Sequence, residues 1–134
     1  MELSRKKVDE LIDLAIKARS FSYSPYSHYA VGAALLTSSG RVYTGANIEN
    51  SAYPDSICAE RVAIFKAVSE GEREFAAIAV ATENGGSPCG SCRQVMSEFS
   101  LNMRVIVVDG SGRIFIDTDA DDLLPHAFTS EDLY

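Results

Sequence analysis

Residues 57–68 read ICAERVAIFKAV, and residues 87–96 read SPCGSCRQVM. Together these two stretches hold all three cysteines of the chain, Cys58, Cys89 and Cys92. In each stretch the first cysteine stands where a helix is predicted to begin. A helix N-terminus presents unpaired N–H groups and a partial positive charge, which favour a thiolate. The two stretches therefore predict two helices that open with metal-binding or catalytic sulfurs.

The segments around these stretches alternate between helix-like and strand-like patterns. Residues 4–20 repeat apolar side chains at spacings of three and four, which predicts an amphipathic helix capped by Ser4. Runs of apolar and β-branched residues predict strands at 31–37, 41–47, 76–82, 104–109 and 113–117. The first two strands are separated by SSG, a short hairpin loop. The third reads AAIAVAT, apolar without alternation, which is typical of a strand buried on both faces.

Start and stop residues predict the remaining helices. The first cysteine-bearing helix ends near Glu70–Gly71, where glycine can stop it. Pro88 suits the first position of the second, which runs through Phe99. Residues 119–128, DADDLLPHAF, predict a short closing helix.

The order of these elements predicts the fold class. Strands that alternate with helices after an opening hairpin indicate an α/β fold with three α/β/α layers and a mixed five-stranded sheet. A chain of 134 residues is expected to form one domain, residues 1–134. At this length about two-thirds of the unfolded surface becomes buried, so the core needs no disulfides.

Composition excludes several classes of function. The net charge is −7 without a concentrated run of Lys and Arg, which disfavours nucleic acid as a partner. No apolar run approaches the roughly eighteen residues of a membrane-spanning helix. The stretch MELSRKKVDE has no apolar region typical of a secretory signal, and an odd number of cysteines favours metal binding or catalysis over disulfides. We expect a cytoplasmic protein.

The spacing of the cysteines predicts a zinc site. Cys89 and Cys92 lie one helical turn apart, so one ion can take both sulfurs, and Cys58 can supply a third. Zinc suits sulfur ligands, and three protein ligands leave a position for water. Glu60 can approach that position without ligating the metal, where a carboxylate acts as a proton shuttle. We expect one zinc ion per chain.

Other interpretations of the cysteines remain open at this stage. CGSC alone is compatible with a thioredoxin-like dithiol, and a structural zinc site could be closed by His28 or His126. Neither accounts for Glu60. The combination of Cys-x-Glu with a later Pro-Cys-x-x-Cys matches the signature of the zinc nucleobase deaminases, with Cys in place of the first His ligand.

Five stretches in order resemble the small homotetrameric cytidine deaminases: YSPYSHYAVGAALLT, GANIENSAYP, ICAERVAIFKAVSEG, SPCGSCRQVM and LLPHAFTSEDL. The resemblance covers nearly the whole chain. It implies a cytidine deaminase-like fold and hydrolytic deamination of cytidine and 2′-deoxycytidine in pyrimidine salvage. It also implies a homotetramer in which neighbouring subunits complete each nucleoside pocket.

The resemblance assigns the roles at the metal. Cys58, Cys89 and Cys92 correspond to the zinc ligands, and Glu60 corresponds to the general acid and base. Arg61 corresponds to the arginine that bonds the thiolates. Three thiolates leave a zinc cluster with net negative charge, which a cation can offset.

The resemblance also assigns the nucleoside contacts. Asn47 and Glu49 correspond to the pair that hydrogen-bonds the ribose hydroxyls, and amide and carboxylate groups can donate to and accept from a sugar edge. The backbone N–H of Ala59 and the carbonyl of Ser87 correspond to the groups that hold the pyrimidine oxygen and exocyclic amine.

Three aromatic residues complete the implied pocket. Tyr29 stands where the family usually has a Phe that packs on the base, so this chain differs there by one hydroxyl. Tyr53 and Phe128 correspond to aromatics that line a neighbouring subunit's pocket. Alternatives to a cytidine deaminase are a nucleic-acid-editing deaminase, a blasticidin S-type deaminase and a structural zinc module without catalysis.

Overall fold

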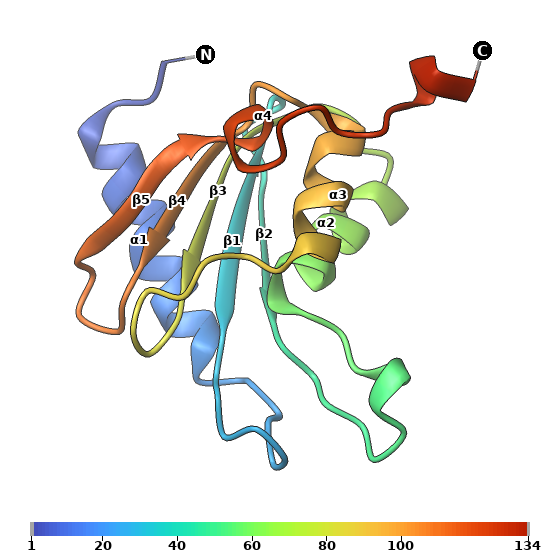
Figure 1. Cartoon of the computed structure of the whole chain (residues 1–134). Helices are drawn as coiled ribbons and strands as arrows, with labels where there is room; N and C mark the ends of the chain where they lie inside the picture. The colour runs from blue at the N-terminus through green and yellow to red at the C-terminus, as the bar shows by residue number, and fades with distance from the viewer. Residues whose placement is uncertain (1, 134) are drawn as a thin grey trace.

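The computed structural model describes residues 2–133. Five strands form one sheet in the order β2-β1-β3-β4-β5 (Figure 1). Their bounds are β1 Gly32–Thr37, β2 Val42–Ala46, β3 Phe75–Ala81, β4 Arg104–Val108 and β5 Ile114–Asp119. β3 and β4 are parallel and the other neighbouring pairs are antiparallel. The prediction of a mixed five-stranded sheet is confirmed.

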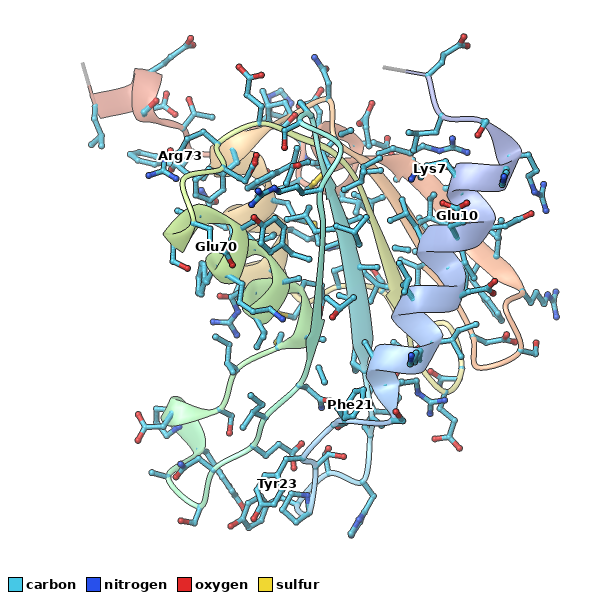
Figure 2. The ribbon with its side chains drawn as sticks, turned by 180° about the vertical axis from the view of Figure 1, so that it is seen from behind. Lys7, Glu10, Phe21, Tyr23, Glu70 and Arg73 are labelled. Carbon is cyan, nitrogen blue, oxygen red and sulfur yellow. The ribbon has the colours of Figure 1, made fainter. Side chains whose placement is uncertain are left out.

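Helices cover both faces of this sheet. α1 (Arg5–Arg19) lies on one face, as the view from behind shows (Figure 2), and α2 (Ala59–Ser69) and α3 (Gly90–Phe99) lie on the other. The short α4 (Ala120–Leu123) follows β5 and packs beside α3. The predicted three-layer α/β/α arrangement is therefore confirmed. Within residues 2–133, no helix is long and apolar enough to span a bilayer.

The sequence of α1 explains its place. Ser4 caps the helix, since its side chain accepts a hydrogen bond from Lys7 N at 3.1 Å. The side chains at helical spacing that face the sheet are buried: Val8, Leu11, Ile12, Ala15 and Ala18. Burial of each large aliphatic side chain stabilises the fold by about 1.5–3 kcal/mol.

β3 is buried on both faces, as its unbroken apolar run predicts. Ala77, Ala79 and Ala81 face α1, whereas Ile78 and Val80 face α2 and α3. The small alanines let α1 approach the sheet, and the larger residues fill the opposite core. β3 thus contributes alternate side chains to two apolar cores, one on each face of the sheet.

The chain order brings two helix N-termini to one end of the sheet. α2 follows β2 through residues 47–58, and α3 follows β3 through residues 82–89. The prediction for the start of α3 is wrong by two residues, because Pro88 precedes the cap instead of occupying the first turn. Cys89 is the cap, and its Sγ accepts from Cys92 N at 3.5 Å.

Two further predicted helix ends can be compared with the structure. α2 ends at Ser69, with Glu70 as its cap and Gly71 at a φ of +98° beyond it, as predicted. The closing helix is shorter than the predicted 119–128. Asp119 caps it and the chain leaves helical geometry at Leu124, immediately before Pro125.

Candidate active site

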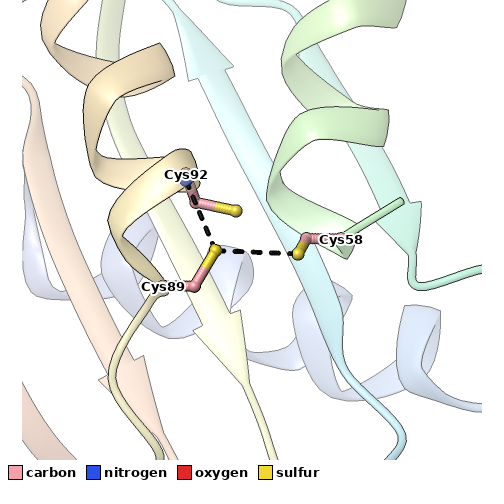
Figure 3. Close-up of side chains that lie close together, drawn as sticks. All are labelled: Cys58, Cys89 and Cys92. Atoms are coloured by element: carbon pink, nitrogen blue, oxygen red, sulfur yellow. Dashed lines mark hydrogen bonds between the residues drawn. The ribbon is translucent and has the colours of Figure 1, made fainter. Parts of the chain in front are cut away.

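The three cysteines meet at the two helix N-termini (Figure 3). Cys58 is the cap residue of α2, Cys89 is the cap residue of α3, and Cys92 lies in the first turn of α3. Their Sγ atoms all lie within 4.8 Å of one another. Tetrahedral zinc with Zn–S bonds of about 2.3 Å separates its sulfurs by a little under 4 Å, so a small closure of the cluster suits this ion.

His28 and His126 are not members of this cluster. In the described part of the chain, the ligand atoms grouped there come from the three cysteines alone. Both histidines are exposed loop residues with left-handed backbone, at φ values of 56° and 57°. A structural zinc site closed by either histidine therefore has no support in this geometry.

Arg61 lies beside the sulfur cluster. Its Nη2 donates to Cys58 Sγ at 3.3 Å. Its Nε is buried and has no hydrogen-bond partner within residues 2–133. An unpaired buried donor costs about 1–3 kcal/mol, and adjacent negative sulfur offsets that cost. The guanidinium thus suits a cluster of thiolates bound to a divalent cation.

Hydrogen bonding shifts the pKa values of two cluster thiols in opposite directions. The hydrogen bond with Cys92, assisted by Arg61, outweighs burial and lowers the pKa of Cys58. The same hydrogen bond and burial raise the pKa of Cys92. Cys58 is therefore the sulfur of this pair that more readily carries negative charge. Since a metal ligates thiolates, a divalent cation among the three sulfurs releases thiol protons.

Glu60 provides a buried carboxyl at the same place. It lies in the first turn of α2, with 4% of its surface exposed. Burial, together with the charge of Cys58, raises the pKa of Glu60 to about 6 against the lowering effect of a backbone hydrogen bond. Within residues 2–133 this carboxyl forms no salt bridge, and burying it costs stability, so its presence beside three sulfurs indicates a catalytic site.

A cavity of about 540 Å³ opens onto this group. Its lining includes Cys58, Cys89, Glu60 and Arg61 together with Val80 from β3. The volume lies within the range of small-molecule sites. Five residues expected to contact a nucleoside also line it: Tyr29, Asn47, Glu49, Tyr53 and Ser87.

Asn47 is engaged within the protein as well as lining the cavity. Its Oδ1 accepts from Val31 N at 2.9 Å and from Ser22 Oγ at 2.5 Å, and its Nδ2 donates to Tyr29 O at 2.8 Å. The amide therefore ties the loop between α1 and β1 to the end of β2. One Nδ2 hydrogen remains to donate to a ligand.

Glu49 is held by the loop between α1 and β1. Its Oε1 accepts from Tyr26 N at 3.0 Å and Ser27 N at 3.1 Å, and its Oε2 accepts from Ser27 Oγ at 2.5 Å. The Ser27 hydroxyl chiefly lowers the pKa of Glu49. A fixed, ionised carboxylate at the cavity edge is an acceptor for hydroxyl groups.

The expected base contacts lie around the same cavity. Ala59 is the first residue of α2, so its N–H belongs to the donors left unpaired at a helix N-terminus. Ser87 lines the cavity from the loop before α3. Tyr29 also lines it, and its hydroxyl donates to Asn84 Oδ1 of the same loop at 2.7 Å.

Tyr53 and Phe128 differ in their relation to the cavity. Tyr53 is 72% exposed, lies on the lining, and makes an edge-on contact with the Tyr26 ring at 5.9 Å. Phe128 is 59% exposed and is absent from the described lining residues. The C-terminal segment that carries Phe128 runs past α3 and away from the sheet (Figure 1).

Sequence reasoning gave no role to Arg93 and Gln94, which hold the segments around the site. Arg93 donates to Pro88 O at 2.9 Å, to Leu123 O at 2.7 Å and to Ser87 Oγ. Gln94 Nε2 donates to Phe128 O at 2.8 Å. The signal was their place directly after Cys92, in the first turns of the helix that carries two ligands.

Fold and site together define a class of protein. A buried carboxylate beside a three-sulfur metal site, both lining a ligand-sized cavity, is the arrangement of zinc hydrolases that deaminate nucleobases. Thioredoxin-like dithiol chemistry requires two thiols that pair with each other, whereas Cys89 and Cys92 here converge with a third sulfur.

Comparisons with known proteins place the chain within this class. Residues 5–108 match the family model "Cytidine and deoxycytidylate deaminase zinc-binding region". The chain is 51% identical over 129 residues to a cytidine deaminase of Sporosarcina psychrophila, covering 94% of each. It is 49% identical over 126 residues to that of Halalkalibacterium halodurans, covering 92% of this chain and 95% of the relative.

A solved structure agrees with these relatives. The cytidine deaminase from Burkholderia pseudomallei superposes with a TM-score of 0.87 at 44% identity, covering 94% of this chain and all of that chain. The protein belongs to the cytidine and deoxycytidylate deaminase family. Its three-cysteine cluster is a zinc site, one per chain.

Proposed function

We propose that this enzyme hydrolyses cytidine and 2′-deoxycytidine to the corresponding uridines and ammonia. The observation that carries the proposal is the buried Glu60 carboxyl on the same cavity as the zinc-ligating cysteines. A structural zinc module needs a fourth protein ligand and has no use for a costly buried carboxyl. The named relatives, both cytidine deaminases, support the substrate class.

In the proposed reaction, Glu60 moves the protons. Zinc bound by the three cysteines supplies Lewis-acid chemistry, because it lowers the pKa of water enough for attack near neutral pH. Glu60 accepts a proton as the water oxygen bonds to C4 of the pyrimidine. It then returns protons to ring N3 and to the departing amine, so one carboxylate serves as base and acid. Cys58 and its helix N-terminus hold Glu60 within reach of C4.

The nucleoside is oriented by the rest of the cavity. We assign Ala59 N–H to the pyrimidine oxygen and the Ser87 carbonyl to the exocyclic amine. The Tyr29 ring packs on the base. Asn47 and Glu49 bind the ribose hydroxyls, and their bonds to the loop between α1 and β1 keep both groups fixed before substrate arrives.

The charge of the cavity favours nucleosides over nucleotides. Its lining contains the carboxylates Glu49 and Glu60, while the guanidinium of Arg61 is engaged with Cys58. A 5′-phosphate would bring further negative charge next to a carboxylate at the cavity edge, in a protein whose net charge is −7, and would be repelled. We therefore propose cytidine and 2′-deoxycytidine as substrates over deoxycytidylate.

We infer that subunits associate around the cavity mouth. Several large apolar residues are exposed, among them Phe21, Tyr23, Ile48, Tyr53 and Phe128, and Tyr53 lines the cavity. Figure 2 labels Phe21 and Tyr23 on the chain that follows α1, and Tyr23 is bonded to Asn47 and Glu49 through backbone groups. A homotetramer in which Tyr53 and Phe128 complete a neighbour's pocket accounts for this exposure. Three thiolate ligands also suit the reducing cytoplasm.

The direct test is ultraviolet monitoring of purified, zinc-loaded protein with separate substrates. Cytidine and 2′-deoxycytidine should lose the cytosine absorbance with release of one ammonia per turnover. Deoxycytidylate should react at least about fivefold more slowly, since repulsion between its phosphate and one carboxylate weakens binding by about 1 kcal/mol or more. Adenosine is the negative control. Unchanged cytidine in the presence of one zinc per chain would refute the proposed function.

A further inference from the structure

The loop between β3 and α3 lies between two aromatic side chains that come from distant parts of the chain. This loop, residues 82–89, carries both Ser87 and the zinc ligand Cys89. Tyr29 contacts it at Gly86, and Phe115 contacts it at Gly85. The two adjacent glycines therefore mark the places where the rings approach the backbone.

On the Tyr29 side the contact is a hydrogen bond supported by close packing. The Tyr29 hydroxyl donates to Asn84 Oδ1 at 2.7 Å. A Cβ at Gly86 would fall on that hydroxyl, so no larger residue fits there without movement. Gly86 N donates to the buried Thr82 Oγ1 at 2.8 Å, which closes the loop into a turn.

The main chain of Tyr29 links this contact to the other end of the cavity. Tyr29 O accepts from Asn47 Nδ2 at 2.8 Å. One residue thus joins the group proposed for the ribose to the loop proposed for the base. A phenylalanine at this position could pack on the base but could not bond Asn84.

On the other side the contact is steric. Gly85 has a φ of +78°, and a Cβ there would lie 2.5 Å from the Phe115 ring. Phe115 lies at an irregularity of β5, where Ile114 and Ile116 pair with the consecutive residues Val108 and Val107. The extra residue of such a bulge is turned out of the regular alternation, which aims Phe115 at the loop.

We propose that Tyr29 and Asn84, backed by Phe115, form a clasp that positions the Ser87 carbonyl for the exocyclic amine of the substrate. Tyr29 hydroxyl and Asn84 are positioning groups, since they act through the loop. The clasp makes binding selective for pyrimidines that carry an amino group at C4. It rests on the proposed function, because the amine contact at Ser87 is part of that proposal.

The clasp predicts a selective effect of removing one hydroxyl. In Tyr29→Phe, the ring remains and the hydrogen bond is lost. KM for cytidine should rise about three- to tenfold, with a smaller change in kcat, as expected for one neutral hydrogen bond. The inhibition constant of a pyrimidin-2-one riboside, which has hydrogen in place of the amine, should change by less than about twofold.

Variants of Asn84 and Phe115 test whether the rise in KM comes from loss of the hydrogen bond between Tyr29 and Asn84. Asn84→Ala should reproduce the Tyr29→Phe result, and the double variant should be no worse than either single one. Phe115→Ala should raise KM for cytidine in the same direction. Matched controls are Tyr43→Phe, a tyrosine near Glu70, and Ile114→Ala, which faces α1. Both controls should match the unmodified protein.

A measurement on protein without substrate separates the clasp from the reaction. Hydrogen–deuterium exchange in residues 83–87 should accelerate at least about threefold in Tyr29→Phe and Asn84→Ala, because the loop loses one restraint. Unchanged exchange, unchanged KM for cytidine, or equal changes for cytidine and the pyrimidin-2-one riboside would each overturn the clasp. If the unmodified protein leaves cytidine intact, the proposed function fails, whereas normal turnover by all clasp variants refutes the clasp alone.

Discussion

Arg61 donates from Nη2 to the Sγ of Cys58 at 3.3 Å, and the two residues lie three positions apart at the start of α2. Because three thiolates and Zn²⁺ carry a net negative charge, this guanidinium reduces the electron density that the sulfurs give to the metal. The contact joins the helix N-terminus, the zinc ligand and the charge balance of the site.

Arg61→Gln should lower kcat by about 10- to 100-fold or weaken zinc binding by a similar factor, since partners of metal ligands contribute on that scale. Steady-state kinetics and a competitive zinc chelator titration measure the two quantities. Arg5→Gln, an exposed arginine on α1, is the control and should change neither. Zinc affinity and kcat that both stay unchanged in Arg61→Gln would remove the arginine from the charge balance.

Cys89→Ala should bind zinc at least about 100-fold more weakly and lower the unfolding temperature, because ligation contributes to folding free energy. Elemental analysis after dialysis and thermal unfolding with and without a chelator provide the measurements. Ser91→Ala, an exposed neighbour between the two α3 ligands, should keep zinc and stability. A Cys89→Ala protein that retains one tightly bound zinc per chain would mean that another group ligates.

The sequence predicts Cys89 and Cys92 as ligands from local order, whereas Cys58, 31 positions before Cys89, is assigned to the same site from its own helix start and the family resemblance. A cysteine at a helix start and another one turn later place two sulfurs together whatever surrounds them. The unbroken apolar run of β3 likewise predicts a buried strand, and the structure confirms it. The start of α3 was predicted wrongly at Pro88, because a cysteine side chain that caps a helix has no strong sequence signal.

The supporting contacts could not be predicted, because they join segments far apart in the chain. Tyr29 and Asn84 are 55 positions apart, and Arg93 reaches Leu123 across 30 positions. Several acceptors are backbone carbonyls, which every residue has, so the residue type of the partner gives no signal. Such contacts follow only from how the loops fold over the end of the sheet.

Phe128→Ala should raise KM for cytidine while zinc content stays at one per chain. If this residue completes a neighbour's pocket, truncation removes an aromatic anchor, which commonly costs about 2 kcal/mol or more. Kinetics and sedimentation at low and high salt provide the measurements. Leu133→Ala, also exposed near the C-terminus, is the control. A fully active monomer at both salt concentrations would refute the shared pocket.

Asp117→Asn should reduce stability at pH 7 by no more than about 1 kcal/mol, since its pair with Arg104 is more than a third exposed. The Arg104 guanidinium, bonded at 2.8 and 2.7 Å, lowers the pKa of Asp117 below its usual value of 3.8. A carboxylate whose pKa is lower in the folded protein than in the unfolded chain stabilises the protein at pH values above the unfolded-state pKa. This contribution is lost as the pH falls through the folded-state pKa.

The difference between Asp117→Asn and the unmodified protein should therefore shrink between pH 7 and about pH 3. Urea unfolding at each pH measures it, with Asp121→Asn on the exposed surface of α4 as the control. A difference that is the same at both pH values would show that the ion pair is not its source.

The central claim is that Glu60 performs proton transfer at a zinc site built from three cysteines, and turnover of zinc-loaded Glu60→Gln tests it most directly. The variant should hold one zinc per chain and keep its unfolding temperature. It should deaminate cytidine at least about 10²- to 10⁴-fold more slowly, as for loss of a general acid-base group. Glu98→Gln, an exposed glutamate on α3, should retain full activity. Full turnover by zinc-loaded Glu60→Gln would contradict the account.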